Sequence, residues 1–399
     1  MAESVEVDTN ALETMLSEAL NSSKRASYWD GFVNIAMDKI KEGKSREVIS
    51  RELHLSKKIS YVIYDLAMSR LKCRVKFSGY RKLWLDTYSS RYSTPEQIGL
   101  YRAERLKGNS ITDIGTGAGM QAIFMAKFSR VVGVEINKPR YLMSLLNSSA
   151  YDWNPPKFNL GDFHENAIKR TGSQVIFSDP LRPPTEQERG MGNLSPNPAE
   201  IMDFYGSETD NFVFDLPPQL KRENIEFDEF ESEYISMDGS INRFTIYMGS
   251  VRRKNFSAVM LPQMIRFESD AQEDFKEISR FPGKYLLSVD PAFIYAGLEG
   301  NISNIYDLSF LYRDKRRVVL TSDSLKENFP GEQFQILRKS SEDNLLNNLI
   351  SLEAGKVIPR YNPGEGYYEF RNNIEEKLSG KEKLYLFNFQ GEILICIKL

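Results

Sequence analysis

Three glycines and two carboxylates stand at spacings that could hold a ligand containing a nucleoside. Gly115, Gly117 and Gly119 alternate along the chain, Asp113 precedes them by two residues, and Glu135 ends the next apolar run. Glycine has no Cβ, so such a segment can turn tightly and let a ligand approach the backbone. An acidic residue that ends the second strand can accept hydrogen bonds from ribose hydroxyls. The pattern predicts strand, glycine turn, helix and strand, with a cofactor outside the turn.

The position of the first carboxylate narrows the choice of cofactor. A dinucleotide site would have its third glycine one position later, where Met120 stands, and a pyrophosphate favours free N–H groups at a helix start. Asp113 instead suits a ligand that carries an ammonium group and a sulfonium. An NAD site and a glycine turn without a ligand remain the alternatives. The segment from Asp113 to Gly119 resembles motif I of class I S-adenosylmethionine (SAM) methyltransferases.

A second chemical signature follows the fourth apolar run, where Asp179 and Pro180 precede Leu181 and Arg182. Ligands of open α/β sheets bind outside the carboxyl ends of the strands, so Asp179 is expected to face the same cofactor. Methyl transfer to an amine is an in-line displacement from a sulfonium and requires the amine lone pair about 3 Å from the methyl group. A carboxylate and a carbonyl fixed by proline can hold an amino group there by accepting its hydrogen bonds.

This signature is similar to the Asp/Asn-Pro-Pro-aromatic motif of amine methyltransferases, with Leu181 in place of the second proline and Arg182 in place of the aromatic residue. Over roughly residues 75–399 the chain resembles class I SAM-dependent methyltransferases that carry a C-terminal THUMP-like domain. Three further segments carry that resemblance: Thr94–Gln97, Leu216–Pro218 and Asp290–Ile294.

The resemblance implies SAM as cofactor and methyl transfer to a base amine nitrogen of structured RNA such as tRNA or rRNA. It assigns Asp179 and Arg182 to catalysis; Arg182 would bind a phosphate, stack on the base or pair with a carboxylate. A protein that binds SAM or RNA without catalysis, and a protein or small-molecule methyltransferase, remain the alternatives. The cofactor residues that it implies are Asp113, Gly115, Gly117, Gly119, Glu135 and Asp162.

Apolar runs along the chain predict an α/β fold in which a Rossmann-like sheet positions these residues. The runs 244–248 and 258–261 are too close for a crossover helix, so an antiparallel hairpin is expected to end the sheet. The domains predicted are a basic helical region, 1–88, a methyltransferase domain, 89–265, and a small α+β THUMP-like domain, 281–399. The parallel strands predicted are 111–114, 131–135, 158–160, 175–178 and 212–214.

The last region has its own alternation of short apolar runs and helical segments. Helices are predicted at 341–354 and 372–379, and no catalytic constellation stands among them. Its charge is near neutral, with 15 basic and 16 acidic residues, apart from a basic cluster at 313–317. We therefore expect it to bind or position something. Its predicted strands are 285–289, 318–320, 334–337, 384–387 and 393–397.

The net charge of −3 conceals a basic region, because residues 24–82 hold 15 Lys and Arg against 6 Asp and Glu. Cations interleaved with aromatic residues can hold phosphates and stack bases, which makes RNA the expected partner. The alternative is a solvated helix face above ordinary aromatic core residues. The candidate surface consists of Lys57, Lys58, Arg70, Lys72, Arg74, Lys76, Arg81 and Lys82, with Tyr61, Tyr64, Tyr80, Trp84 and Tyr88.

The remaining composition excludes several classes of protein. The 399 residues are 41% hydrophobic and 27% charged, which is ordinary for a globular protein. No apolar run is long enough for a signal peptide or a membrane span, so a cytoplasmic protein is expected. Two cysteines and two histidines are too few for a zinc cluster, and no metal is expected. The oligomeric state stays open.

Overall fold

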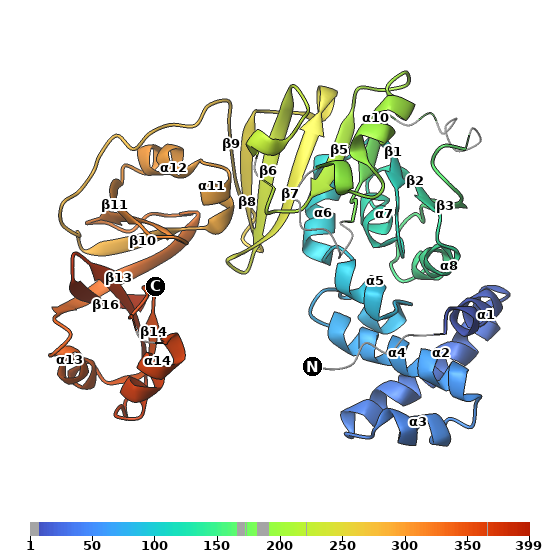
Figure 1. The fold of residues 1–399 in the computed structure, drawn as a ribbon, viewed down its shortest axis with the longest axis horizontal. Helices are drawn as coiled ribbons and strands as arrows, with labels where there is room; N and C mark the ends of the chain where they lie inside the picture. The colour runs from blue at the N-terminus through green and yellow to red at the C-terminus, as the bar shows by residue number, and fades with distance from the viewer. Residues whose placement is uncertain (1–7, 166–171, 173, 182–190, 221, 365) are drawn as a thin grey trace. The chain divides into compact units, whose positions relative to one another are not determined.

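The computed structural model describes residues 8–165, 172, 174–181, 191–220, 222–364 and 366–399. The chain forms two compact units (Figure 1). The first unit holds residues 1–230 and 245–253, and the second holds 231–244 and 254–399. The three-part division into 1–88, 89–265 and 281–399 stays a prediction. No helix in the described part of the chain is long and apolar enough to cross a membrane.

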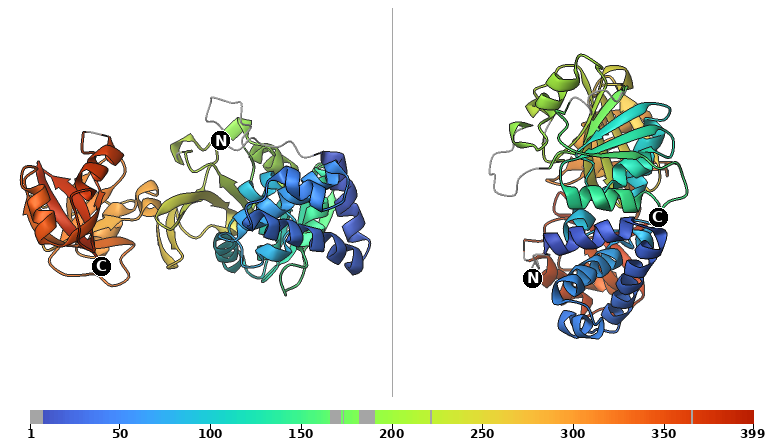
Figure 2. Two further views of the ribbon diagram at one scale, coloured as in Figure 1. Left: turned by 90° about the horizontal axis from the view of Figure 1, so that it is seen from below. Right: turned by 90° about the vertical axis from the view of Figure 1, so that its right-hand side faces the viewer.

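The first unit begins with four helices, α1 (Thr9–Leu20), α2 (Ser23–Lys41), α3 (Arg46–Glu52) and α4 (Lys57–Cys73). Each begins at a polar side chain that accepts a backbone N–H three residues on, as expected of N-cap residues. Their apolar faces join the core of the sheet, and α1 packs on α8 (Lys138–Asn147). Figure 2 shows these blue helices on the side of α8 that faces away from the sheet. The N-cap residues are Asp8, Ser22, Ser45 and Ser56.

Three short helices lead into the sheet: η1 (Tyr80–Lys82), α5 (Thr87–Tyr92) and α6 (Glu96–Arg105). The parallel strands then alternate with helices, as predicted. In chain order, these strands and helices are β1 (Ser110–Ile114), α7 (Met120–Met125), β2 (Arg130–Glu135), α8, β3 (Lys157–Leu160), β4 (Val175–Ser178), η2 (Met191–Asn193), α10 (Pro198–Tyr205) and β5 (Phe212–Leu216). The register is parallel between β1 and β2, β2 and β3, β1 and β4, and β4 and β5.

The predicted hairpin at the end of the sheet is wrong. The order of this sheet is β3-β2-β1-β4-β5-β7-β6-β8-β9, so β7 (Ser240–Met248) and β8 (Phe256–Leu261) are not neighbours. The strand β6 (Phe230–Met237) lies between them and runs parallel to β8. The tight turn joins β6 to β7 at Asp238 and Gly239, both of which have positive φ, and such a pair favours a two-residue hairpin.

The sequence concealed β6 because its polar residues are buried. Glu231 and Glu233 lie in the interior, where Ser257 of β8 donates hydrogen bonds to them at 2.5 and 3.5 Å. Arg266 of β9 (Ile265–Ser269) also lies near both carboxylates, at 3.7 and 3.9 Å. Buried carboxylates are tolerated where they are paired and hydrogen-bonded. A strand of this kind has no apolar run by which to recognise it.

The second unit contains a sheet of seven strands, in the order β11-β12-β10-β13-β16-β15-β14. The five strands predicted for this region are confirmed. The strands β11 and β14 were not predicted, and the last helix, α14, begins five residues before its predicted start. One side of the sheet buries Phe334 and Phe387, and the other buries Leu349 and Leu384. Whether this sheet is THUMP-like stays a prediction.

The elements after β9 are, in chain order, β10 (Tyr285–Val289), α11 (Pro291–Tyr295), α12 (Glu299–Ile305), β11 (Ser309–Arg313), β12 (Val318–Ser322), β13 (Gly331–Ser340), α13 (Leu345–Ser351), β14 (Ala354–Pro359), α14 (Tyr367–Glu375), β15 (Glu382–Phe389) and β16 (Glu392–Lys398).

Candidate functional site

Two adjoining cavities open at the carboxyl ends of β1, β2 and β4, within the first unit. Their volumes are about 200 and 390 Å³. They share four lining residues, Gly115, Ile136, Ser195 and Pro196. The sheet order reverses between β1 and β4, which is where open α/β sheets bind their ligands.

The three glycines of the turn have left-handed φ angles but different surroundings. A Cβ added to Gly117 would meet no atom within 4 Å, so this glycine faces the open cavity. Gly115 also lines the cavity, close to Pro196. A Cβ at Gly119 would lie 2.7 Å from Cβ of Ser144 and 2.8 Å from Phe158, and Gly119 does not line either cavity. Gly119 therefore allows the turn to pack on α8 and β3, and its role in binding stays a prediction.

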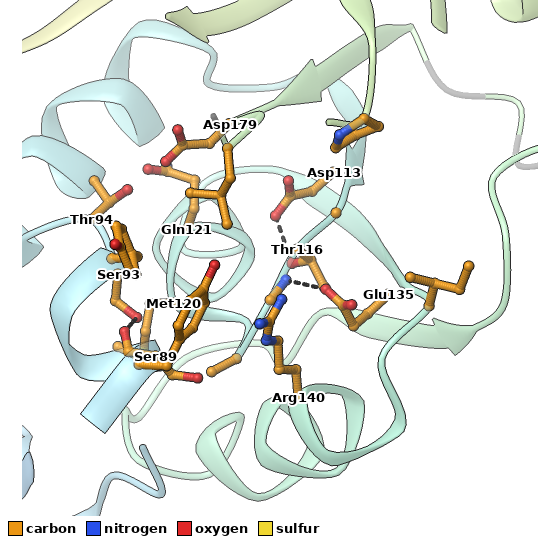
Figure 3. Close-up of a pocket in the computed structure, with 18 of the residues that line it drawn as sticks. Ser89, Ser93, Thr94, Asp113, Thr116, Met120, Gln121, Glu135, Arg140 and Asp179 are labelled. Carbon is orange, nitrogen blue, oxygen red and sulfur yellow. Dashed lines mark hydrogen bonds between the residues drawn. The ribbon is translucent and has the colours of Figure 1, made fainter. Parts of the chain in front are cut away.

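Glu135 lines the first cavity and holds the glycine turn. One carboxylate oxygen of Glu135, which Figure 3 shows beside the turn, accepts the Gly117 N–H at 2.7 Å. The other oxygen accepts the Asn137 N–H at 2.8 Å. A carboxylate offers about four acceptor positions, so these two bonds leave capacity for ligand hydroxyls.

Asp113 is buried at the base of the same cavity. Burial raises the pKa of its carboxyl to about 7; the hydrogen bond from Thr116 and the nearby Arg102 lower it, whereas the negative charges of Asp179 and Glu135 raise it. The Thr116 hydroxyl donates that bond at 2.6 Å. A cation bound beside Asp113 would favour the ionised carboxylate.

Asp179 faces the cavity that contains Asp113. Figure 3 shows Asp179, Gln121 and Thr94 on one side, with Asp113, Thr116 and Glu135 on the other. The structure thus gathers, from three strand ends and the glycine turn, five of the residues predicted from the sequence. They are Asp113, Gly115, Gly117, Glu135 and Asp179. Arg182 lies outside the described residues.

The second cavity contains the other predicted acid, Asp162. Its carboxylate accepts the His164 backbone N–H at 3.0 Å and lies 2.7 Å from Nδ1 of the same histidine. The backbone hydrogen bond is the main cause that lowers the pKa of Asp162. Phe163 and Ile136 supply apolar wall, and the Ile136 side chain is 68% exposed. Flat apolar ligands could insert between such side chains.

A buried polar cluster beneath the cavity consists of residues that were not predicted from the sequence. Arg102 donates hydrogen bonds to Gln121 at 2.7 Å, Asp215 at 2.5 Å and Thr245 at 3.2 Å. Its guanidinium also lies 4.9 Å from the ring centroid of Phe177. Asp215 directly precedes the segment Leu216–Pro218, and its carboxylate is engaged by Arg102. No local sequence pattern predicts this cluster, because its members lie up to 143 residues apart in the chain.

Asn147 ties the N-terminal helices to the glycine turn. Its side chain accepts the Trp84 N–H at 2.7 Å and donates to the carbonyls of Trp84 and Ala118 at 3.1 and 2.9 Å. Ala118 belongs to the turn and lines the first cavity. The N-terminal helices also reach the cavity through α5, whose Tyr88, Ser89 and Tyr92 line it together with Ser93 and Thr94.

The predicted basic surface loses several of its members. Arg70 is buried, donates to the Leu83 carbonyl at 2.7 Å and pairs with Asp30 at 2.6 Å, and Trp84 is buried beneath it. Lys58 pairs with Asp8, and Lys76 donates to the carbonyls of two α5 residues. Trp84 is an aromatic core residue, as the alternative supposed, whereas Arg70 lies neither on a nucleic-acid surface nor on a solvated helix face. The exposed cations that remain are Lys57, Lys72, Arg74, Arg81 and Lys82.

No group of three or more His, Cys, Asp or Glu in the described ranges is placed to hold a metal ion. Cys73 and Cys396 are buried as free thiols.

Comparison with known proteins identifies the fold. No protein-family model matches the chain, and no curated protein matches its sequence. The crystal structure of a proposed methyltransferase from Porphyromonas gingivalis W83 superposes with a TM-score of 0.75 and 15% identity, over 93% of this chain and 98% of that one. The chain therefore has the α/β fold of that protein. At this identity the likeness concerns the fold alone.

Two other solved structures match over smaller parts of the chain. One is a proposed class I SAM-dependent methyltransferase from Listeria monocytogenes, with 13% identity, coverage of 60% and 87%, and a TM-score of 0.31. The other is a proposed RNA methyltransferase from Pyrococcus horikoshii, with 17% identity, coverage of 39% and 82%, and a TM-score of 0.28. At these TM-scores the two matches add nothing to the fold assignment.

Proposed function

We propose that the chain is a SAM-dependent methyltransferase that modifies a base amine nitrogen of structured RNA. One observation carries the proposal: two cavities that share a glycine-turn wall hold carboxylates at three strand ends, Asp113, Glu135 and Asp179, and a fourth, Asp162, in the second cavity. Such a set suits a ligand with a cationic amino-acid end and a nucleoside end.

The residues present fit SAM. The open space before Gly117 would admit the cofactor, the Asp113 carboxylate would face its cationic end, and Glu135 would accept its ribose hydroxyls. The adenine would lie in the second cavity, against Ile136 and Phe163 and beside Asp162. When bound, SAM supplies an electrophilic methyl group.

Asp179 would position the acceptor. Its carboxylate would accept a hydrogen bond from the acceptor amino group, which orients the nitrogen lone pair toward the methyl group. This nitrogen would take the methyl group of SAM with release of S-adenosylhomocysteine, and the Asp179 carboxylate or solvent would take up the proton that the nitrogen loses. Leu181, two positions after Asp179, also lines the cavity and would add apolar surface beside the acceptor.

The choice of RNA is supported by the THUMP-like resemblance and by the exposed lysines and arginines that remain on the N-terminal helices. Basic residues of this kind bind phosphate with an affinity that falls as salt rises.

Isothermal titration calorimetry with SAM, S-adenosylhomocysteine and NAD tests the cofactor. Transfer of labelled methyl from SAM to total RNA or to protein, each from cells lacking the gene, tests the reaction. We expect binding of both adenosyl compounds, none of NAD, and label in RNA that falls steeply with ionic strength. Binding without label in either pool would favour the non-catalytic alternative, and label in protein alone would favour a protein methyltransferase.

A further inference from the structure

Helix α5 presents two exposed tyrosines to the first cavity. Tyr88 and Tyr92 stand four residues apart, so both project from the same face of the helix. Both line the cavity, yet their side chains are 42% and 44% exposed. Their ring centroids are 4.7 Å apart and the ring planes are inclined by 45°. The rim of the cavity therefore carries a broad aromatic surface in contact with water.

Hydrogen bonds on its other side hold this helix in place. Asp65 of α4 accepts the Thr87 N–H at 2.9 Å and the Thr87 hydroxyl at 2.5 Å. The Lys76 ammonium donates to the carbonyls of Ser90 and Arg91 at 3.0 and 2.9 Å. A surface held in this way loses little conformational entropy when a ligand binds.

The described part of the opposite wall has one aromatic side chain, Phe177 of β4, and this ring is fully buried, with the Arg102 guanidinium 4.9 Å from its centroid. Leu181 is the third residue of the motif that begins at Asp179, and it lines this wall of the cavity. Its backbone forms two hydrogen bonds with the backbone of Ser195, at 2.9 and 3.0 Å. The amine methyltransferase motif has an aromatic residue at its fourth position, where the sequence of this chain has Arg182. In this chain the aromatic surface lies across the cavity, on α5.

Charge restricts what this surface can bind. Asp113, Glu135 and Asp179 line the same cavity and disfavour an anionic group beside them. The Arg140 guanidinium lies 4.4 Å from the Tyr88 ring centroid, where a cation–π contact stabilises the ring position. An uncharged planar ring with an amino group fits both the aromatic surface and the carboxylates.

We infer that Tyr88 and Tyr92 form the stacking platform for the methyl acceptor, and that the acceptor is a nucleobase of a single-stranded or extruded nucleotide. The inference rests on the proposed function, because it places the base beside Asp179. Stacking of a base on an aromatic side chain accounts for roughly a 10-fold change in affinity, and tolerates any base.

Fluorescence anisotropy tests the platform with two labelled strands: a short single-stranded RNA of mixed sequence and the same strand with abasic residues. The full chain is compared with Tyr88→Leu, Tyr92→Leu and the conservative Tyr88→Phe. The matched control is Tyr28→Leu, since Tyr28 is 48% exposed on α2 and lines neither cavity. SAM affinity of each variant is measured in parallel by calorimetry.

We expect each leucine variant to bind the base-containing strand about 10-fold more weakly, with Tyr88→Phe and Tyr28→Leu unchanged and abasic binding equal in all proteins. Equal affinity of the unsubstituted protein for both strands, or leucine variants without effect, would overturn the inference. The outcome does not depend on methyl transfer. Failure to bind SAM would contradict the proposed function alone, while the comparison of strands would still decide the platform.

Discussion

The Glu135 carboxylate at the end of β2 accepts the Gly117 N–H at 2.7 Å, so the second strand holds the glycine turn that follows the first. The other carboxylate oxygen accepts the Asn137 N–H at 2.8 Å. One side chain thus shapes both the turn and the start of α8. A change at this position affects the fold as well as any ribose contact.

Glu135→Gln should weaken the turn. A glutamine has one acceptor oxygen, so its NH₂ group would face one of the two N–H donors, at a cost of about 1–3 kcal/mol in the free energy of unfolding. SAM affinity should fall at least 10-fold by calorimetry. The control Glu104→Gln changes an exposed residue and should shift stability by less than about 0.5 kcal/mol. Equal urea midpoints for both variants would contradict the prediction.

Gly117→Ala and Gly119→Ala should separate ligand binding from packing. Gly117 has φ +61° and open space ahead, so alanine should cost about 1–2 kcal/mol of stability through backbone strain and should abolish SAM binding. Gly43→Ala is its control, because Gly43 has φ +80° and equally open surroundings. Undiminished SAM binding by Gly117→Ala would refute the cofactor position.

Gly119→Ala should instead destabilise the fold, because its new Cβ would lie 2.7 Å from Cβ of Ser144. Overpacking of this kind costs about 1–3 kcal/mol beyond backbone strain. Thermal unfolding of the unliganded protein measures the loss. A melting temperature equal to that of Gly43→Ala would show that the turn can relax away from α8.

SAM affinity should increase with pH up to about pH 7.5. The unliganded Asp113 carboxyl has a pKa raised to about 7, and only its ionised form attracts the cationic end of the cofactor. Calorimetry should give roughly 5-fold tighter binding at pH 7 than at pH 6, a range in which an α-amino group stays largely protonated. Asp113→Asn should remove this dependence. A flat profile for the unsubstituted protein would contradict the assignment.

The same pKa has the opposite effect on the stability of the unliganded protein. Because the folded pKa exceeds the ordinary aspartate value of 3.8, the contribution of Asp113 to stability is present below about pH 4 and is lost as pH rises through about 7. Urea unfolding across this range should show a smaller loss of stability in Asp113→Asn. An identical slope in both proteins would place the pKa of Asp113 near its ordinary value.

Asp179→Ala should separate binding from transfer. The side chain faces the cavity but belongs to none of the elements that hold the glycine turn, so SAM affinity should stay within a few-fold. Without the Asp179 carboxylate the methyl acceptor would no longer be held in position, which should lower kcat by about 100-fold or more. The measurement is labelled-methyl transfer at saturating SAM. A variant that loses SAM binding but transfers methyl normally at high SAM would reverse the proposed roles.

Arg102→Met should lower the free energy of unfolding by about 3–5 kcal/mol, because it leaves the buried Asp215 carboxylate without its cationic partner. Lys107→Met, at an exposed position of the same segment, serves as control and should be close to neutral. Chemical denaturation measures both. A change below 1 kcal/mol for Arg102→Met would show that other groups compensate the charge.

Local patterns in the sequence were sufficient for the parallel half of the sheet and for the turn. Apolar runs of three to five residues locate β1 to β5, and alternate glycines with a flanking acid locate the segment that lines the first cavity. These features depend on backbone conformation and on neighbours close in sequence, so the local sequence is enough to predict them. Asp179 follows from the same logic, because parallel strands bring their carboxyl ends to one edge.

The position of β6, the buried Arg102 cluster and the approach of α5 to the cavity were decided by packing between distant parts of the chain. The strand β6 buries Glu231 and Glu233, and only the partners on β8 and β9 make that burial tolerable. Arg102 meets Asp215 across 113 residues of chain, and α5 reaches the cavity because the N-terminal helices pack on α8. Such contacts depend on the order of strands and on the docking of helices. They cannot be predicted from the periodicity or spacing of residues, because the local sequence around each partner contains no sign of the contact.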